Sequence, residues 1–422
     1  MKVKRLKMTA FRGINDLTLE FDDTEPTVLI GINGVGKSSI LDCLAILISE
    51  FQQWIFKYQK NPDSFYREKD IMKKRDKTRN VLTLQWNSRE GEWHSIGEPR
   101  EQKILQKNSH LEGNLSEVIK DFRNHFVDNF DANANLPLAI YYPVNRAVLD
   151  IPLEIPEEHL FKQIDAYDQA LTGVQIGFGS FFQWFRALED LENEERRDEP
   201  DYRNRQLEAV RQAIYLLLFG FSNLRVRRSP LRMTINKQGQ ELIINQLSDG
   251  EKGLLALAGD LARRLAIANP SLPDPLQGSG VVLIDEIELH LHPKWQREII
   301  PALTRTFPNC QFIITTHSPQ VISEVKPDGI YILERTDDGI VAMRPESSYG
   351  RDTNRILEDL MDTPERPQEI KESLLELFRL IAKGELDSAR QLHQKIADKI
   401  GADEPELVGA SVSIRRREIL GR

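Results

Sequence analysis

The chain has 422 residues, of which 40% are hydrophobic and 29% charged, and its formal net charge is −9. This length allows one large core or two to three ordinary domains, and the acidic balance argues against a nucleic-acid coat protein without excluding a local basic groove. The two cysteines, Cys43 and Cys310, exclude a disulfide framework and a cysteine-based zinc site. The longest strongly apolar run, 213–221, is about half as long as a membrane span requires. We therefore expect a cytoplasmic chain with no membrane contact.

Hydrophobic periodicity predicts strands and helices in alternation along most of the chain. A glycine-rich turn separates the first strands from a buried helix at 38–50. Further on, two strand pairs read as hairpins, and a long helix follows the second pair. The predicted strands are 3–6, 17–21, 27–30, 81–86, 93–96, 136–145, 281–284 and 311–315, with a hairpin over 224–244. The predicted helical segments are 38–50, 157–220 and 247–268.

The C-terminal residues 346–422 differ in texture from the rest of the chain. They have no strand pattern and few glycines. One amphipathic stripe runs from Ile370 to Ile381, Gly384 interrupts it, and a second stripe runs from Ala389 to Ile400. This pattern predicts an α-helical hairpin appended to an α/β body.

The first motif that carries chemistry follows the strand at 27–30, where residues 31–38 read GINGVGKS. It fits G-x-x-x-x-G-K-[ST] between a strand and a helix, although an ordinary glycine-rich turn is the alternative. Glycines permit a tight loop of N–H groups around an anion, to which the helix N-terminus adds positive potential. We expect Lys37 to bind the β- and γ-phosphates of ATP and Ser38 to bind Mg²⁺. The predicted ATP-binding residues here are Gly31, Asn33, Gly34, Val35, Gly36, Lys37, Ser38 and Ser39.

A second motif, VVLIDE at 281–286, places two acids directly after a strand of four apolar residues. Such a strand belongs in the middle of a sheet, and its carboxyl end is where α/β sheets bind ligands. Asp285 is therefore predicted to hold Mg²⁺, mostly through water. Glu286 is predicted to act as the general base that activates the attacking water.

The third motif, LSDGEKG at 247–253, resembles the signature of ABC-type ATPases, close to its form in chromosome-maintenance and DNA-repair members. The family resemblance implies that this signature, Ser248, Asp249, Gly250 and Glu251, acts on the site of an opposite subunit, where Ser248 and Gly250 contact the γ-phosphate. Asp249 departs from the usual glycine, which makes slow hydrolysis plausible. A simple helix N-cap is the structural alternative for Ser248.

Three further features carry the resemblance. The strand that ends in FIITTHSP at 312–319 places His317 where the family has its γ-phosphate sensor. Phe11-Arg12-Gly13 is similar to an element of RecF-like heads in which the arginine approaches the nucleotide. The ELHLHP segment at 288–293 is similar to an extension in SMC-like and OLD-like ATPases, which favours a place near a dimer seam over a metal site at its two histidines. The family glutamine at the Mg²⁺ site has no counterpart that we can place; the segment 141–146 is expected at the corresponding strand end.

Spacing indicates the branch of the family. Lys37 and Ser248 lie about 210 residues apart, too far for a transporter subunit, and no sustained heptads indicate an SMC arm. We predict a P-loop ATPase head with a lobe at 1–50, an inserted hairpin and helical lid at 51–245, a second lobe at 246–345 and a helical region at 346–422. The tail, with SYGRDTNRIL at 348–357, resembles the PtuA ATPases of Septu and some retron defence systems. That resemblance implies a homodimer or an oligomer of dimers that regulates an HNH-type nuclease similar to PtuB.

Two other functions stay open at this point. A RecF-like maintenance ATPase would contact DNA directly, and the basic clusters at 67–79, 225–232 and 415–417 could supply phosphate contacts. A non-hydrolysing scaffold would use ATP as a structural ligand that locks an oligomer. Charge runs are more often solvated faces than binding sites.

Overall fold

The computed structural model describes residues 1–22, 24–56, 66–86, 89–100, 103–113, 115–124, 134–146, 161–173, 175–337 and 339–420. The chain forms two compact units, Met1–Thr353 and Asn354–Arg422. Each unit has its own hydrophobic core.

A six-stranded sheet lies at the centre of the first unit, in the order β14-β13-β3-β12-β11-β7. Five of these strands run parallel, and β14 pairs antiparallel with β13 at one edge. Every residue of β3, β7 and β11 is buried, as expected for parallel strands covered on both faces. The strands are β3 (Thr27–Ile30), β7 (Leu138–Tyr142), β11 (Gly280–Ile284), β12 (Cys310–Thr315), β13 (Ile330–Thr336) and β14 (Gly339–Met343).

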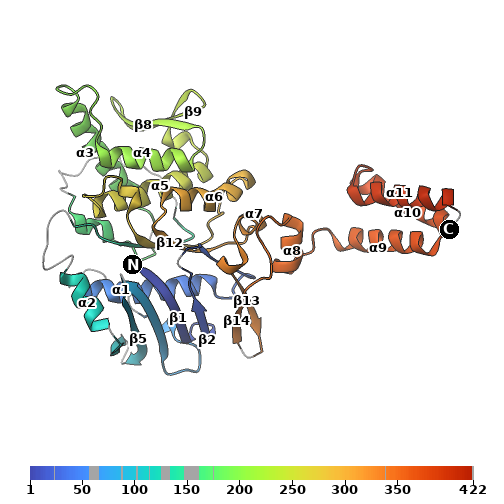
Figure 1. Ribbon diagram of the computed structural model, residues 1–422, viewed down its shortest axis with the longest axis horizontal. Helices are drawn as coiled ribbons and strands as arrows, with labels where there is room; N and C mark the ends of the chain where they lie inside the picture. The colour runs from blue at the N-terminus through green and yellow to red at the C-terminus, as the bar shows by residue number, and fades with distance from the viewer. Residues whose placement is uncertain are drawn as a thin grey trace. The chain divides into compact units, whose positions relative to one another are not determined.

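An antiparallel sheet in the order β2-β1-β4-β5-β6 forms a second layer, and α1 (Lys37–Phe56) lies between the two sheets (Figure 1). This helix contacts β4 on one side and β7, β11 and β12 on the other. It is long and apolar enough to cross a membrane, but two thirds of that apolar window is buried, so we assign it as the core helix of this unit. The second sheet contains β1 (Lys2–Phe11), β2 (Ile14–Glu20), β4 (Thr78–Trp86), β5 (Arg89–Arg100) and β6 (Lys103–Gly113), and α2 (Leu115–Arg123) packs on it.

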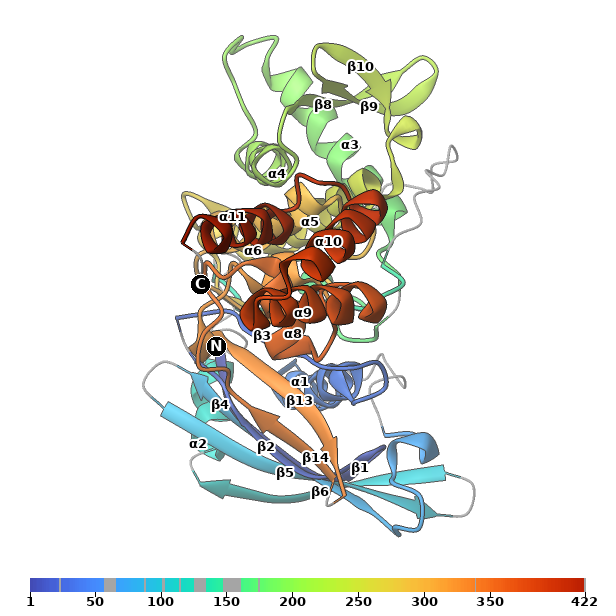
Figure 2. The same ribbon diagram turned by 90° about the vertical axis from the view of Figure 1, so that its right-hand side faces the viewer.

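Helices cover the other face of the parallel sheet. Neighbouring side chains on β7 point in opposite directions, so Tyr142 donates to Asp260 on α5 (3.0 Å) while Tyr141 faces Asp42 on α1. Figure 2 shows β8, β9 and β10 at one end of this unit and the antiparallel sheet at the other. The remaining elements are α3 (Phe178–Glu195), α4 (Arg205–Leu217), α5 (Asp249–Ala268), α6 (Pro293–Thr306), α7 (Pro319–Ile322), β8 (Phe221–Arg228), β9 (Leu231–Lys237) and β10 (Gln240–Ile243). The short 3-10 helices are η2 (Glu68–Asp70), η4 (Gln163–Tyr167), η5 (Ile244–Gln246), η6 (Pro275–Gln277) and η7 (Pro327–Gly329).

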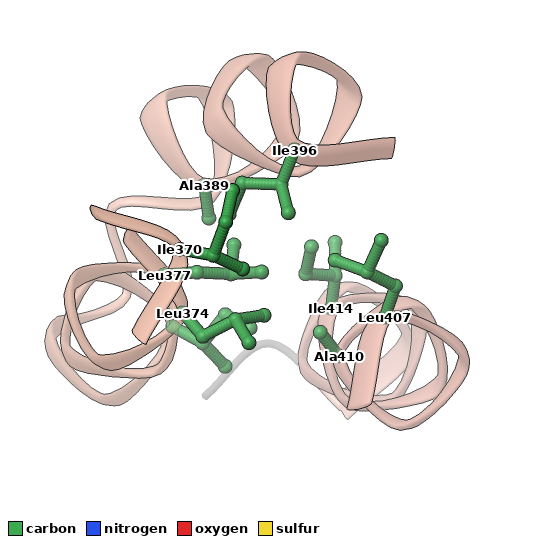
Figure 3. Close-up of a cluster of buried hydrophobic side chains, with 9 residues drawn as sticks. Ile370, Leu374, Leu377, Ala389, Ile396, Leu407, Ala410 and Ile414 are labelled. Atoms are coloured by element: carbon green, nitrogen blue, oxygen red, sulfur yellow. The ribbon is translucent and has the colours of Figure 1, made fainter. Parts of the chain in front are cut away.

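The second unit is a bundle of α9 (Gln368–Lys383), α10 (Leu386–Ile400) and α11 (Pro405–Leu420), which follow α8 (Thr353–Met361). Its core side chains converge from all three helices of the bundle (Figure 3). Gly384 ends α9 with a φ of +82°, which costs glycine least. The predicted helical hairpin is confirmed as α9 and α10. A third helix packs against both of them and supplies Leu407, Ala410 and Ile414 to the core.

Several predicted elements differ from the observed ones. The predicted hairpin at 224–244 has three strands: the expected turn near Gly239 returns β10 onto β9, and an additional turn at Ser229 and Pro230 joins β8 to β9. The segment predicted as helical over 157–220 contains η4 and turns at 163–172 before α3 begins, and 157–160 lie outside the described residues. The region 51–245, predicted as an insertion, supplies β4–β6 to the sheet of β1 and supplies β7 to the parallel sheet.

Glu50 introduces a pH dependence of stability in this core. Its side chain is 3% exposed and accepts a hydrogen bond from Ser95. Burial raises the pKa of Glu50 from 4.5 to about 8. The folded state therefore keeps a proton that the unfolded chain releases, so the free energy of unfolding falls as the pH rises from about 4.5 to about 8, by up to about 5 kcal/mol.

A Glu50→Gln variant is expected to lack this part of the pH dependence, because glutamine stays neutral and can still accept from Ser95. Urea unfolding of both proteins between pH 5 and pH 9, on a scale of about 1.4 kcal/mol per pKa unit, measures the difference. Equal slopes of stability against pH in the two proteins would contradict the assignment.

Candidate functional site

The loop between β3 and α1 requires glycine at its first position. Gly31 has a φ of +143°, and a Cβ there would lie 2.4 Å from the carbonyl oxygen of Leu333. Gly36, at φ +114°, ends the loop directly before α1. Val35 is buried and anchors the loop, whereas Asn33 and Ser38 are exposed. The loop thus has a buried base and a polar face open to solvent.

Lys37 folds back onto this loop. Its Nζ donates to the carbonyl oxygens of Gly31 (2.8 Å) and Ile32 (3.0 Å), and the residue is 6% exposed. Burial lowers the pKa of Lys37, although nearby carboxylates oppose the shift. A partly desolvated ammonium inside a loop of glycines fits an anionic ligand, which would compensate its charge better than two carbonyl groups.

Two acids lie at the carboxyl end of β11, next to the end of β12. The hydroxyl of Thr315 on β12 donates to Asp285 Oδ1 (2.5 Å) and accepts from the backbone N–H of Glu286 (2.8 Å). Asp285 is 3% exposed, while Glu286 is half-buried and has a φ of +46°. The neighbouring strand therefore fixes both acids at the sheet edge that the sequence predicted.

His317 lies beside these acids and is held through Glu288. The backbone N–H of His317 donates to Glu288 Oε1 (2.5 Å), and the hydroxyl of Thr316 donates to Oε2 (2.7 Å). Burial and the charge of Lys37 lower the pKa of the His317 imidazole, against the pull of the neighbouring carboxylates. The loop lysine, the acids after β11 and the histidine after β12 thus form one electrostatic cluster.

The segment predicted as a signature motif starts α5. Ser248 caps this helix: its hydroxyl accepts from the N–H of Glu251 (3.4 Å), and its own N–H donates to Glu251 Oε2 (2.8 Å). A Cβ on Gly250 would lie 2.2 Å from the carbonyl oxygen of His290, so only glycine fits there. The side chain of Asp249 is 82% exposed. Within one chain, Ser248 is therefore the N-cap of α5, which was the structural alternative to a signature motif.

Arg12 lies at the turn between β1 and β2 and pairs with two carboxylates. Its guanidinium contacts Asp42 on α1 and donates to Asp70 Oδ1 at 2.8 Å. Together with Tyr141, these residues line a cavity of about 230 Å³. For Arg12 to contact a nucleotide, as the sequence predicts, its guanidinium would have to leave Asp42 or Asp70. This contact stays a prediction.

Residues 27–323 match the protein family described as AAA domain, putative AbiEii toxin, Type IV TA system. The chain belongs to this AAA-domain family. It is 29% identical over 481 residues to the Retron Ec83 probable ATPase of Escherichia coli, covering 99% of this chain and 87% of that protein. It is 29% identical to the Retron Vc95 probable ATPase of Vibrio cholerae serotype O1 biovar El Tor, covering 92% and 85% of the two chains.

The AAA-domain chain is also 24% identical to the Septu protein PtuA of Bacillus thuringiensis, covering 86% of this chain and 85% of that protein. The predicted resemblance to PtuA and the prediction of an ATPase are thereby confirmed. Among solved structures, an SMC head bound to the C-winged helix domain of ScpA aligns with a TM-score of 0.48 and 15% identity, covering 82% of this chain and 98% of that chain. The SMC head domain from Thermotoga maritima aligns with a TM-score of 0.45 and 18% identity, covering 82% and 100%.

The AAA-domain site also contains three residues to which the sequence assigned no role: Arg146, Thr315 and Glu288. Arg146 follows β7 and donates to the backbone carbonyl of Glu286 at 2.5 Å. It lies in the segment predicted to occupy the position of the family glutamine, so the break at Pro143 after a buried strand could have indicated it. The hydrogen bonds of Thr315 and Glu288 depend on strand register, so no local sequence pattern could have indicated them.

The oxygen groups of this AAA-domain site fit a magnesium ion. Ser38 presents an exposed hydroxyl on the first turn of α1, and Asp285 presents a buried carboxylate from the adjacent β11. Mg²⁺ prefers one or two such ligands, completed by phosphate oxygens and water. In the described part of the chain, no group of three His, Cys, Asp or Glu side chains is arranged to hold a metal. His292 instead caps α6, where its Nδ1 accepts from Lys294 N–H (3.3 Å).

Proposed function

We propose that the chain binds and hydrolyses Mg·ATP at the edge of its parallel sheet. The convergence of Lys37, Asp285, Glu286 and His317 at the ends of three neighbouring strands carries this proposal. Lys37 supplies positive charge to the phosphates, and the Asp285 carboxylate and the Ser38 hydroxyl suit Mg²⁺. The half-buried Glu286 can accept a proton. AAA-family membership and relatives named as probable ATPases support the same chemistry.

In this mechanism the triphosphate replaces the carbonyls of Gly31 and Ile32 as partners of the Lys37 ammonium. Ser38 and Asp285 would hold Mg²⁺, which when bound would neutralise charge on the phosphate oxygens. Glu286 accepts the proton of the attacking water at a carboxylate oxygen. His317 donates a hydrogen bond to the γ-phosphate from its imidazole, whose pKa is lowered by burial and by the charge of Lys37.

We further propose that two chains close around two nucleotides. The start of α5 combines the Ser248 hydroxyl with the positive potential of a helix N-terminus, which suits an anion on a facing subunit, whereas the exposed carboxylate of Asp249 would oppose it. When ATP seats Ser248 against the partner's γ-phosphate, the Ser248 hydroxyl would exchange Glu251 for the phosphate. A site shared between two copies makes hydrolysis dependent on protein concentration.

In its biological setting, we propose that the chain acts in anti-phage defence and controls an HNH-type nuclease partner in the cytoplasm. Relatives named as retron and Septu proteins support this placement. Direct DNA contact is less well supported at 225–232. There Arg227 pairs with Glu241, and Arg228 pairs with Glu189 and Asp190, so much of the local positive charge is already compensated.

Phosphate release and molecular mass, measured on the purified full-length chain, test this function together. Turnover should need Mg²⁺ and rise with protein concentration, and ATP should shift the mass toward a dimer. Tight ATP binding without turnover would favour the scaffold function instead. Turnover that DNA stimulates in a salt-sensitive way would favour the RecF-like function.

A further inference from the structure

Arg146 is a buried cation that binds the backbone of the catalytic segment. Its side chain is 5% exposed. Nη1 donates to the carbonyl oxygen of Asp285, and Nη2 donates to the carbonyl oxygen of Glu286 at 2.5 Å. A weaker contact at 3.4 Å joins Nη1 to the carbonyl of Pro143 in its own turn. The guanidinium thus uses both arms of its planar fork on two consecutive peptide groups.

The backbone at this place needs such support. Glu286 has a φ of +46°, a left-handed conformation that is uncommon for residues other than glycine and that costs about 1 kcal/mol or more. Thr315 holds the N–H of Glu286 from the side of β12, and Arg146 holds its carbonyl from the side of β7. The peptide groups on both sides of the Glu286 Cα are therefore fixed, and with them the direction of its Cα–Cβ bond.

The charge of Arg146 also acts on the acids of the site. Burial lowers the pKa of its guanidinium, while Glu288, Asp285 and Glu286 raise it, which shows that these three carboxylates lie close enough to interact with it. The guanidinium charge therefore lies behind the segment that carries these acids.

We propose that Arg146 is a positioning residue for ATP hydrolysis: it clamps the carbonyls of Asp285 and Glu286 so that the Glu286 carboxylate faces the water that attacks the γ-phosphate. The proposal rests on the proposed ATPase function. It differs from a simple packing role, because it predicts a loss in turnover with nucleotide binding retained.

The test compares Arg146→Ala and Arg146→Lys with the wild-type chain. Lysine keeps a charge but cannot bind both carbonyls as a planar fork. The alanine variant should bind ATP with a Kd within about threefold of wild type, while its kcat falls by about 10- to 100-fold, as small misplacements of a catalytic group do. The kcat of the lysine variant should lie between those of the alanine variant and the wild type.

Chemical rescue separates positioning from folding. Free guanidinium ion, at concentrations far below those that unfold proteins, should raise the kcat of Arg146→Ala several-fold by occupying the vacated space, and equal concentrations of sodium chloride or urea should not. Arg264→Ala is the matched control, because Arg264 is also buried and donates to two backbone carbonyls, those of Ala166 (2.8 Å) and Asp168 (2.9 Å). Its kcat per folded molecule should show no guanidinium response.

Three results would overturn the proposal: an Arg146→Ala kcat within twofold of wild type, a loss of ATP binding or of folding in both Arg146 variants, or rescue that Arg264→Ala shares. Failure of the ATPase function would look different. In that case the wild-type chain and a Glu286→Gln variant would release phosphate at the same rate, whatever the Arg146 variants do.

Discussion

Replacing Glu286 with glutamine is expected to lower the kcat for ATP hydrolysis by about 10²- to 10⁴-fold, the usual contribution of a general base. Glutamine matches the size of glutamate, but its neutral amide cannot take the proton of the attacking water. The backbone bonds from Thr315 and Arg146 involve the N–H and the carbonyl of this residue, so the substitution leaves them in place. ATP affinity should therefore stay within a few-fold of wild type, and phosphate release under single-turnover conditions measures the loss.

Glu298→Gln provides the control for that experiment. Glu298 is an exposed acid on α6, so the variant makes the same chemical change outside the site. It should hydrolyse ATP at the wild-type rate. The Glu286→Gln chain, with ATP bound but not hydrolysed, should accumulate as a dimer in light scattering. If this variant turned over ATP as fast as wild type, another group would have to activate the water.

A Lys37→Ala variant is expected to bind ATP at least about 30-fold more weakly, the effect of removing one partner from a buried, hydrogen-bonded charge pair. The nucleotide-free protein should stay as stable as wild type or become more stable. Burial already lowers the pKa of Lys37, so its ammonium pays a desolvation cost that two carbonyl bonds only partly offset. Titration calorimetry gives the affinity, and thermal unfolding without nucleotide gives the stability.

Lys294→Ala serves as the comparison, because Lys294 is an exposed lysine on the first turn of α6. Its ATP affinity should equal that of wild type. Wild-type affinity in Lys37→Ala as well would mean that the loop after β3 does not hold the phosphates. A lower stability of its nucleotide-free form would mean that Lys37 supports the loop structurally.

The parts of the site that the sequence predicted are those in which strand, loop and helix follow one another directly. The glycines at 31–36, Lys37 and Asp285 each belong to such a local unit, and a buried strand that ends in a polar residue places that residue at a sheet edge. The structure brings Lys37, Asp285 and His317 into one cluster, as their order after parallel strands implied.

What the sequence could not provide are interactions set by register and by long-range pairing. Thr315 meets Asp285 because β12 pairs with β11 in one particular register, and Arg146 meets Glu286 across 140 residues of chain. The pairing of β4 with β1 is likewise non-local, so the strands after α1 appeared to belong to an insertion. The third helix of the C-terminal bundle was missed because its buried Leu407, Ala410 and Ile414 alternate with other apolar residues that face solvent.

The central claim is that each ATP is hydrolysed between Lys37 of one chain and Ser248 of another. Mixing equal amounts of a Lys37→Ala chain and a Ser248→Arg chain tests it most directly. Each variant alone should be inactive, whereas random pairing puts one intact composite site into about half of the dimers, so the mixture should recover about a quarter of the wild-type turnover. A mixture as inactive as its two components, or full activity in Ser248→Arg alone, would contradict the account.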